Sequence, residues 1–191
     1  MVLDWDAYAA EWEQNPVITA YADKAFESLQ QQLDIRGKHI LDFGCGTGLL
    51  TQKMAALAKD IVALDGSEAM IEQLDHKELV NVEPVVDQLT RGLVAMHPAF
   101  RGQFDLVVAS SVCGYLPNYS DVVDVIYSIV DNGGWFIHWD WLDEGDNGLT
   151  PERVQTVLSS VGFESVTVSV PFTIETTAGE RSVLMGVGYK S

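Results

Sequence analysis

Residues 39–50 read HILDFGCGTGLL, a short apolar segment followed by a turn that contains three glycines and by the start of a second apolar segment. Ile40, Leu41 and Phe43 are typical of a strand that is buried on both faces of a sheet. The three glycines allow the backbone to turn sharply where a side chain would interfere. The stretch therefore predicts a strand, a tight turn and a helix in succession, and the rest of the chain can be placed around it.

The helix predicted after this turn begins near Leu49. Thr47 is its expected N-cap, and Leu50, Met54 and Leu57 fall on one helical stripe. The first N–H groups of a helix have no partner within the helix, so they face outward from the turn. A ligand is therefore expected at this point of the chain.

Strand and helix patterns alternate along most of the sequence. Strands are expected at 39–43, 61–65, 82–86, 104–111, 135–141, 163–170 and 183–189, and helices at 17–33, 49–58, 67–76, 121–130 and 151–162. Pro84 interrupts the third strand, and residues 88–103 carry no clear pattern. The last two strands have no helix between them, so they should pair antiparallel across a loop at 171–182. This order predicts an α/β sandwich around a mostly parallel seven-stranded sheet that ends in an antiparallel hairpin.

The N-terminal segment, residues 1–16, contains Trp5, Tyr8 and Trp12 at spacings that place them on one face of a short helix closed by Pro16. Two interpretations remain open. The aromatic side chains either anchor the N-terminus to the body of the protein or form a lid over a bound ligand. Together with the loops 88–103, 112–120 and 171–182, this segment would shape the binding pocket.

The chain of 191 residues has a formal net charge of −17, from 28 acidic and 11 basic residues, without a basic cluster. This charge argues against nucleic-acid or anionic-membrane partners, and no apolar run is long enough for a membrane helix. Cys45 and Cys113 are expected to be free thiols in a reducing compartment. The N-terminus has no secretory or transit pattern, so a cytoplasmic location is expected.

The spacing of the turn decides between several nucleotide-binding patterns. The dinucleotide pattern GxGxxG requires a glycine or alanine at position 49, where this chain has Leu49. A phosphate-binding GK[ST] sequence is absent. Asp42, two positions before the first glycine of the turn, is acidic. Asp65 ends the second predicted strand, where an acid in doubly wound sheets binds both hydroxyls of a ribose. A nucleoside with a positively charged, phosphate-free tail fits these features, and S-adenosylmethionine meets that description.

The motifs of the chain, in order, resemble those of class I S-adenosylmethionine-dependent methyltransferases. ILDFGCGTG is similar to their first motif, ALDGSEAM to the second, Asp87-Gln88-Leu89 to the third, FDLVVASSVCGYL to the fourth and IVDNGGWFIHWDW to the fifth. The resemblance covers nearly the whole chain. It implies one domain over residues 1–191, with a helical lid and cover at 1–35 and a Rossmann-like doubly wound core at 36–191.

The resemblance also implies a cofactor site for S-adenosylmethionine. Gly44, Cys45 and Gly46 would contact its methionine part, Asp42 its ammonium group, Asp65 its ribose, Gly66 and Met70 its adenine, Asp87 the adenine amino group and Ser110 the surroundings of the sulfonium, with Gln88 in the third motif and Tyr8 and Trp12 in the lid. Gly48 would permit close helix packing. Methyl transfer is then expected, to a small molecule that the sequence does not identify.

The acceptor is constrained mainly by motifs that are missing. SSVCGYLP lacks the [DNS]PP[YF] signature of enzymes that methylate nucleic-acid bases, and no Pro-Cys nucleophile or magnesium-binding acid follows the fourth strand. The acidic residues 140, 143, 144 and 146 lack the spacing of a calcium loop, so a solvated loop without metal is expected. Tyr115 and His138 are the candidates for a general base, because both are expected at strand ends that face the crevice.

Two other functions remain open. The first is a protein that binds S-adenosylmethionine or S-adenosylhomocysteine without turnover, as a regulator or partner subunit. The second, a nicotinamide-dependent oxidoreductase, is weakened by Leu49. The oligomeric state is not predicted.

Overall fold

The computed structural model describes residues 3–143 and 148–191. In chain order its elements, with η for a 3-10 helix, are η1 (Trp5–Gln14), α1 (Pro16–Gln32), β1 (His39–Phe43), α2 (Leu49–Ala55), β2 (Asp60–Asp65), α3 (Glu68–Asp75), β3 (Val82–Val86), α4 (Arg91–Met96), η2 (Pro98–Phe100), β4 (Phe104–Ser110), η3 (Cys113–Tyr115), α5 (Tyr119–Ile129), β5 (Val130–Trp141), α6 (Pro151–Val161), β6 (Glu164–Thr176) and β7 (Gly179–Tyr189). None of the described helices is long and apolar enough to cross a membrane.

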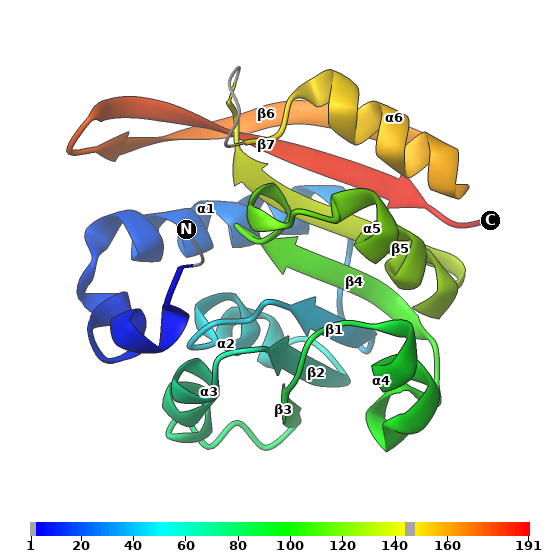
Figure 1. The fold of residues 1–191 in the computed structure, drawn as a ribbon, viewed down its shortest axis with the longest axis horizontal. Helices are drawn as coiled ribbons and strands as arrows, with labels where there is room; N and C mark the ends of the chain where they lie inside the picture. Colours follow the sequence, from blue (N-terminus) through cyan, green and yellow to red (C-terminus); the bar gives the residue numbers. More distant parts are fainter. Residues whose placement is uncertain (1–2, 144–147) are drawn as a thin grey trace.

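The strands form one seven-stranded sheet in the order β3-β2-β1-β4-β5-β7-β6. The pairs from β3 to β5 are parallel, and β7 runs antiparallel to both of its neighbours. This architecture confirms the predicted α/β sandwich with its C-terminal antiparallel hairpin. Strand order reverses direction between β1 and β4, the place where doubly wound sheets bind ligands at their carboxyl ends. Figure 1 shows η1 and the start of α1 on that side of the sheet.

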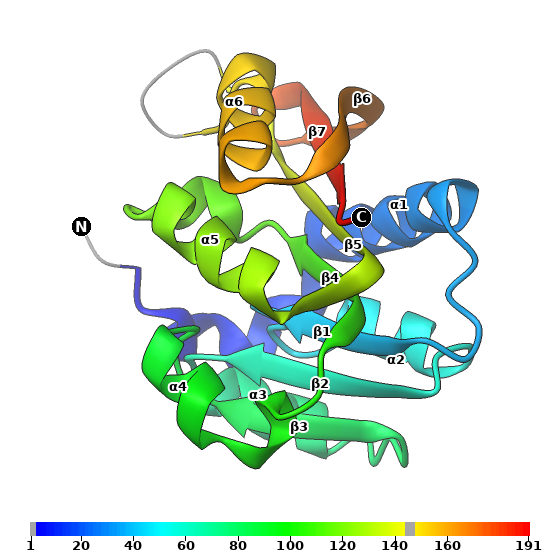
Figure 2. The ribbon, with the colours of Figure 1, turned by 90° about the vertical axis from the view of Figure 1, so that its right-hand side faces the viewer.

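Helices cover both faces of the sheet, with α1, α2 and α3 on one face and α4, α5 and α6 on the other (Figure 2). Successive side chains of a strand point to opposite faces. Leu41 and Val107 therefore pack in the cluster beneath α5, whereas Ile40 and Val108 pack in the cluster beneath α1. Burial on both faces explains why the central strands are almost continuously apolar.

The C-terminal hairpin is longer than the sequence pattern suggested. Residues 171–182, expected to be a loop beside the pocket, belong almost entirely to β6 and β7, and none of them lines the cavity described below. Only positions 177 and 178 separate the two strands. Gly179 has a φ of +105°, and the Thr176 hydroxyl donates a hydrogen bond of 2.7 Å to its carbonyl, which closes the turn. The polar residues in this region alternate along extended strands and do not form a loop.

Residues 88–103, which had no clear pattern, form α4 and η2. The Thr90 hydroxyl accepts a hydrogen bond from Leu93 N–H, and the His97 ring accepts one from Ala99 N–H, so each short helix begins at a side-chain cap. Pro84 lies within an uninterrupted β3, which is tolerated because β3 is the edge strand and needs no donor on its free side.

Candidate active site

A cavity of about 650 Å³ opens at the carboxyl ends of the central strands, below η1. Its volume falls within the range of small-molecule sites, roughly 300 to 1,000 Å³. Twelve of the fourteen residues proposed from the sequence line it: Trp12, Asp42, Gly44, Cys45, Gly46, Asp65, Gly66, Met70, Asp87, Gln88, Ser110 and Tyr115. The loop predicted at 112–120 contributes Val112, Tyr115 and Leu116 to the lining, and 88–103 contributes Gln88.

The glycine turn forms the floor of this cavity between β1 and α2. Gly46 has a φ of +56°, and a side chain added there would find only the Trp12 indole nitrogen nearby, at 3.7 Å, so it would project into the cavity. Gly48, with a φ of +86°, is the N-cap of α2, and a Cβ there would overlap Leu74 of α3. The expected N-cap, Thr47, is therefore wrong, since its hydroxyl instead donates a 2.8 Å hydrogen bond to Glu13.

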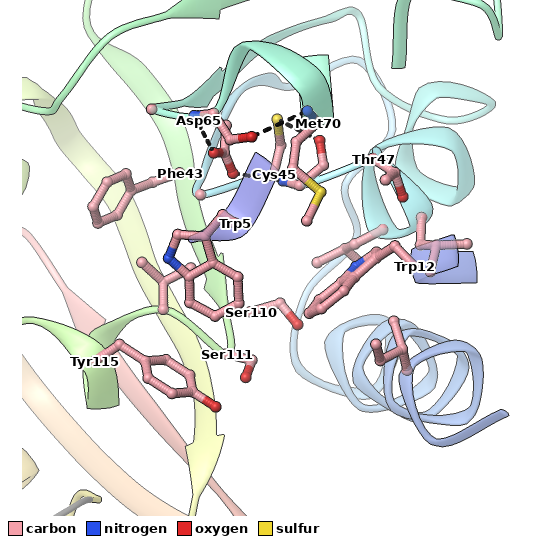
Figure 3. A pocket seen from close by; sticks show the side chains of 18 of the residues that line it. Trp5, Trp12, Phe43, Cys45, Thr47, Asp65, Met70, Ser110, Ser111 and Tyr115 are labelled. Atoms are coloured by element: carbon pink, nitrogen blue, oxygen red, sulfur yellow. Dashed lines mark hydrogen bonds between the residues drawn. The ribbon is translucent and has the colours of Figure 1, made fainter. Parts of the chain in front are cut away.

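Asp65 ties the glycine turn to the second strand. One carboxylate oxygen accepts a 2.8 Å hydrogen bond from Gly46 N–H, and the other accepts one of 2.8 Å from Ser67 N–H. Desolvation raises the pKa of Asp65, and these two N–H donors counteract part of the rise. The carboxylate is thus fixed at the cavity wall in one orientation (Figure 3).

Asp42 is almost completely buried behind the turn, and its carboxylate accepts a 2.6 Å hydrogen bond from the Thr51 hydroxyl. Desolvation raises its pKa to about 7, partly offset by the Thr51 hydrogen bond and reinforced by nearby Asp65. Such a carboxyl group changes charge near neutral pH. A cation in the cavity would favour its ionised form.

The far end of the cavity, beside β3, is built around Gly66. A side chain at Gly66 would overlap the Gln88 amide, so the absence of one lets the loop after β3 approach the loop after β2. Asp87 is exposed and accepts a 2.7 Å hydrogen bond from Gln88 N–H. Met70 is buried in the first turns of α3 and borders the same space. These groups form a partly exposed end of the cavity with apolar and polar walls.

Two acidic side chains hold η1 over the cavity. Asp6 accepts hydrogen bonds from the Ser67 hydroxyl and from Ala69 N–H at the start of α3. Glu13 accepts from Thr47 and forms an ion pair with Lys77. The sequence did not single out either acid, because only the folded chain brings them to α3 and to the glycine turn.

The aromatic side chains of η1 are divided between the cavity and solvent. Trp5 and Trp12 line the cavity and contact each other edge to face at 5.9 Å between ring centroids. Tyr8 was expected over the ligand, but it is half exposed, packs at the edge of Trp5 and does not line the cavity. The cavity side of the 3-10 helix carries the two indoles and Asp6.

Of the two general-base candidates, only Tyr115 reaches the cavity, where it contacts Trp5 edge to face at 5.5 Å. His138 is fully buried and does not line it. Its expected position is wrong, although β5 ends at Trp141 as predicted: His138 lies three residues before that end, and the alternation of the strand directs it with Phe136 into the face covered by α5. Trp141 is the residue of β5 that borders the cavity.

His138 instead belongs to a buried network behind η3. Its ring is hydrogen-bonded to Asp140 at 2.6 Å and to the Tyr119 hydroxyl at 3.1 Å. Asp140 also accepts a 2.7 Å hydrogen bond from Gly114 N–H, which fixes the residue before Tyr115. Asp140 is therefore a buried strand residue, and the prediction that it belongs to a solvated loop is wrong. Positions 144 and 146 of that predicted loop lie outside the described residues.

A doubly wound sheet with a glycine turn after β1 and a carboxylate after β2, both in one cavity, defines a class of nucleoside-binding α/β proteins. The chain belongs to the methyltransferase domain family, whose model matches residues 41–136.

Curated proteins with similar sequences are also named as methyltransferases. A ubiquinone biosynthesis O-methyltransferase of Paraburkholderia phymatum is 30% identical over 128 residues, which cover 64% of this chain and 50% of that protein. The same-named protein of Shewanella pealeana is 31% identical over 123 residues, 63% of this chain and 48% of that protein. The chain thus spans about half the length of the curated relatives it matches.

Solved structures share the fold at lower identity. The DhpI–SAH complex superposes with a TM-score of 0.77 at 23% identity, covering 98% of this chain and 93% of that one. A methyltransferase described as putative, in complex with the Trm112 methyltransferase activator of Haloferax volcanii, gives 0.79 at 14% identity, covering 99% and 98%. At these identities the comparison establishes the fold alone.

Proposed function

We propose that the protein is an enzyme that transfers a methyl group from S-adenosylmethionine to a small-molecule acceptor. The observation that carries this proposal is the hydrogen bond from Gly46 N–H to the Asp65 carboxylate. It brings the glycine turn together with the acid at the position that binds ribose in doubly wound sheets, and both line one cavity. Among the described residues, no Lys, Arg or His side chain lines that cavity to receive a pyrophosphate. This absence argues against a dinucleotide, as Leu49 does.

The cavity residues fit the parts of S-adenosylmethionine. Asp65 would bind the ribose hydroxyls, and Gly66, Met70 and Asp87 would surround the adenine, with Gln88 beside them. Asp42 would face the ammonium group and Ser110 the sulfonium region. The open space above Gly46 supports this placement, because the backbone there can contact a ligand directly.

Alignment and exclusion of water are the main tasks left to the protein. The sulfonium, when bound, supplies a methyl group that is already activated for in-line displacement. Trp5 and Trp12 line the cavity beneath η1 and would reduce the space open to water around a bound ligand. The relatives are named O-methyltransferases, which supports oxygen as the methylated atom. Nucleic acid is not an expected acceptor, because the net charge is −17.

The location of the protein is part of the proposal. Cys45 and Cys113 are free thiols in the structure, which supports a reducing compartment such as the cytoplasm.

Ligand titrations and a turnover assay test this function. S-adenosylhomocysteine at about 100 times its dissociation constant should stabilise the protein by about 2.7 kcal/mol and raise Tm by roughly 5 to 11 °C. NAD at the same concentration should give no shift. Incubation of S-adenosylmethionine with a panel of small hydroxylated molecules, followed by mass spectrometry, should then detect a methylated product and S-adenosylhomocysteine.

Two outcomes would change the assignment. A shift with NAD alone would replace the proposal by an oxidoreductase. Tight binding of S-adenosylhomocysteine without turnover on any acceptor class would favour the non-catalytic binding protein, which the methyltransferase relatives do not support.

A further inference from the structure

The order of the strands divides the cavity into two halves. Asp87 follows β3, Asp65 ends β2 and the glycine turn follows β1, so the adenosine and methionine groups of the proposed cofactor would extend across the ends of these three neighbouring strands. The remaining half lies at the ends of β4 and β5, where Ser111 and Trp141 line the cavity together with Tyr21 of α1. The following inference rests on the proposed function and concerns this second half.

The Tyr21 hydroxyl is the feature of this half that needs an explanation. Tyr21 is 5% exposed, and its hydroxyl is the single fully buried side-chain polar atom in residues 3–143 and 148–191 that makes no hydrogen bond of normal geometry. The Ser111 hydroxyl lies close enough to influence its pKa but does not meet the geometry of a hydrogen bond. Its ring is held edge to face by Trp141 at 5.1 Å and by Phe172 at 5.8 Å. Buried hydroxyls are nearly always paired, so an unpaired one at a cavity wall indicates that a ligand supplies the partner.

Two further hydroxyl groups accompany Tyr21. Ser111 has a left-handed backbone with a φ of +59°, and its N–H donates a 2.8 Å hydrogen bond to Trp139 of β5. Left-handed backbone is uncommon for residues other than glycine and concentrates at functional sites. Figure 3 shows Ser111 and Tyr115 next to each other, across the cavity from Asp65. The polar groups of this half are therefore neutral hydroxyls.

Aromatic rings form the walls around these hydroxyls. Trp5 contacts Tyr115, and Trp141 contacts Tyr21, in both cases edge to face. The Arg181 guanidinium lies over Trp141 at 4.2 Å but does not line the cavity. No described lining residue is basic, and positions 144–147 read EGDN, so they add no basic side chain. When S-adenosylhomocysteine occupies the cofactor half, which then has no sulfonium, an anionic group would therefore be desolvated here without a cationic protein partner.

We propose that Tyr21, Ser111 and Tyr115 form the acceptor subsite, and that this subsite binds an uncharged aromatic ring whose hydroxyl oxygen accepts a hydrogen bond from Tyr21. The ring lies between the aromatic walls, and its hydroxyl is the group that is methylated. An acceptor that needs a basic side chain to hold an anionic group would find none among the described residues that line this subsite.

Methyl transfer to this hydroxyl does not require a side chain that acts as a base. The acceptor oxygen forms a bond to the methyl carbon while the carbon–sulfur bond breaks, and the bonding electrons stay on sulfur, which becomes a neutral thioether. The hydroxyl proton of the acceptor passes to water. Burial, the largest cause, and the nearby Asp140 carboxylate raise the pKa of Tyr21 well above its usual range, although hydrogen bonding by the nearby Ser111 hydroxyl would counteract this, so Tyr21 stays protonated as the donor.

Binding of three naphthalene derivatives to the protein saturated with S-adenosylhomocysteine tests the inference. The probes are 2-naphthol, 2-methylnaphthalene, which replaces the hydroxyl by a methyl group, and 2-naphthoate, which carries a charge. One net hydrogen bond corresponds to about 2- to 13-fold in affinity, so calorimetry should show 2-naphthol bound tighter than 2-methylnaphthalene by roughly that factor. It should show 2-naphthoate bound more weakly than both.

Tyr21→Phe should remove the preference for 2-naphthol over 2-methylnaphthalene and change the affinity for S-adenosylhomocysteine by less than about twofold. Tyr127→Phe, which alters a tyrosine outside the cavity that packs on Phe163, is the matched control and should keep the preference. Equal affinity for 2-naphthoate and 2-naphthol, or an unchanged preference in Tyr21→Phe, overturns the inference. If S-adenosylhomocysteine itself does not bind, it is the proposed function that fails.

Discussion

At the scale of single residues, Asp42 shows how burial links the stability of this protein to its proposed cofactor. Its pKa is raised to about 7, first by desolvation. A carboxyl group with a folded-state pKa above its unfolded value of 3.8 binds a proton more tightly in the folded state. Its contribution to stability is therefore present at low pH and is lost as the pH rises through about 7. A ligand ammonium group near Asp42 would lower the pKa of Asp42, because the positive charge stabilises the carboxylate.

Asp42→Asn separates these two effects. At pH 8 the variant should unfold with a free energy larger by about 1 to 4 kcal/mol, because roughly three pKa units of unfavourable ionisation are removed. Its affinity for S-adenosylhomocysteine should fall by about tenfold and should no longer depend on pH between 6 and 8. Urea unfolding measures the first quantity and calorimetry the second.

The exposed Asp131 provides a matched control for this prediction, since Asp131→Asn removes the same charge outside the cavity. It should leave both quantities close to wild type. If Asp42→Asn binds S-adenosylhomocysteine with the wild-type pH profile, the ammonium group does not lie near Asp42.

At the scale of elements, η1 is the part of the fold with the clearest dependence on a few contacts. Long 3-10 helices have poor hydrogen-bond geometry, so η1 relies on Asp6 and Glu13, which connect it to α3 and to the glycine turn. Glu13 is exposed in part, and such pairs stabilise by only about 0 to 1 kcal/mol. We therefore propose that η1 is a lid that can open, and the alternative is a fixed anchor.

Hydrogen exchange tests this lid. Backbone amides of Trp5–Gln14 should exchange more slowly with S-adenosylhomocysteine than without it, whereas amides of β1 and β4 should be protected in both states. Asp6→Asn combined with Glu13→Gln should speed exchange in η1 and weaken ligand binding by about 3- to 10-fold. Glu11→Gln, an exposed acid in the same helix, should do neither. Equal protection of η1 with and without ligand would mean that the segment is only an anchor.

Elements governed by local sequence were predictable. The turn between β1 and α2 follows from three glycines between two apolar segments, and α3 and α6 follow from the N-caps Ser67 and Thr150. The length of the C-terminal hairpin was not predictable, because residues 171–182 are mostly polar and become strand only through pairing of β6 with β7.

Site residues show the same division. Asp65 and the glycines could be placed because they terminate strands whose pattern is clear. His138 could not, since the end of β5 is buried on both faces and its pattern does not show which face holds His138. Tyr21 lies in the helix predicted at 17–33 and was not proposed as a site residue. The available signal was its hydroxyl, which requires a partner wherever the ring is buried. Ser111 gave no signal, because its left-handed backbone appears only in the folded chain.

At the scale of the whole molecule, charge is the dominant feature. Lys and Arg form ion pairs with acids at Arg36–Asp34, Lys53–Asp23, Lys77–Glu13 and Arg91–Asp124. The net charge of −17 nevertheless leaves many carboxylates without a basic partner. Self-repulsion of that kind destabilises a compact state. Salt should therefore reduce the repulsion between carboxylates more than it reduces the attraction within the few ion pairs, and so stabilise the folded protein.

Thermal unfolding at two pH values tests this balance. Raising NaCl from 0.01 to 1 M shortens the Debye length from about 30 to about 3 Å, and at pH 8 it should raise Tm by roughly 2 to 6 °C, which corresponds to about 1 to 1.5 kcal/mol. At pH 5, close to the isoelectric point of about 4.3, the net charge is small and the same salt should change Tm much less. A Tm that falls with salt at pH 8 would mean that the ion pairs outweigh the repulsion. A rise of equal size at both pH values would point to an effect of salt on hydrophobic burial and not on charge, because burial does not depend on the ionisation of the carboxylates.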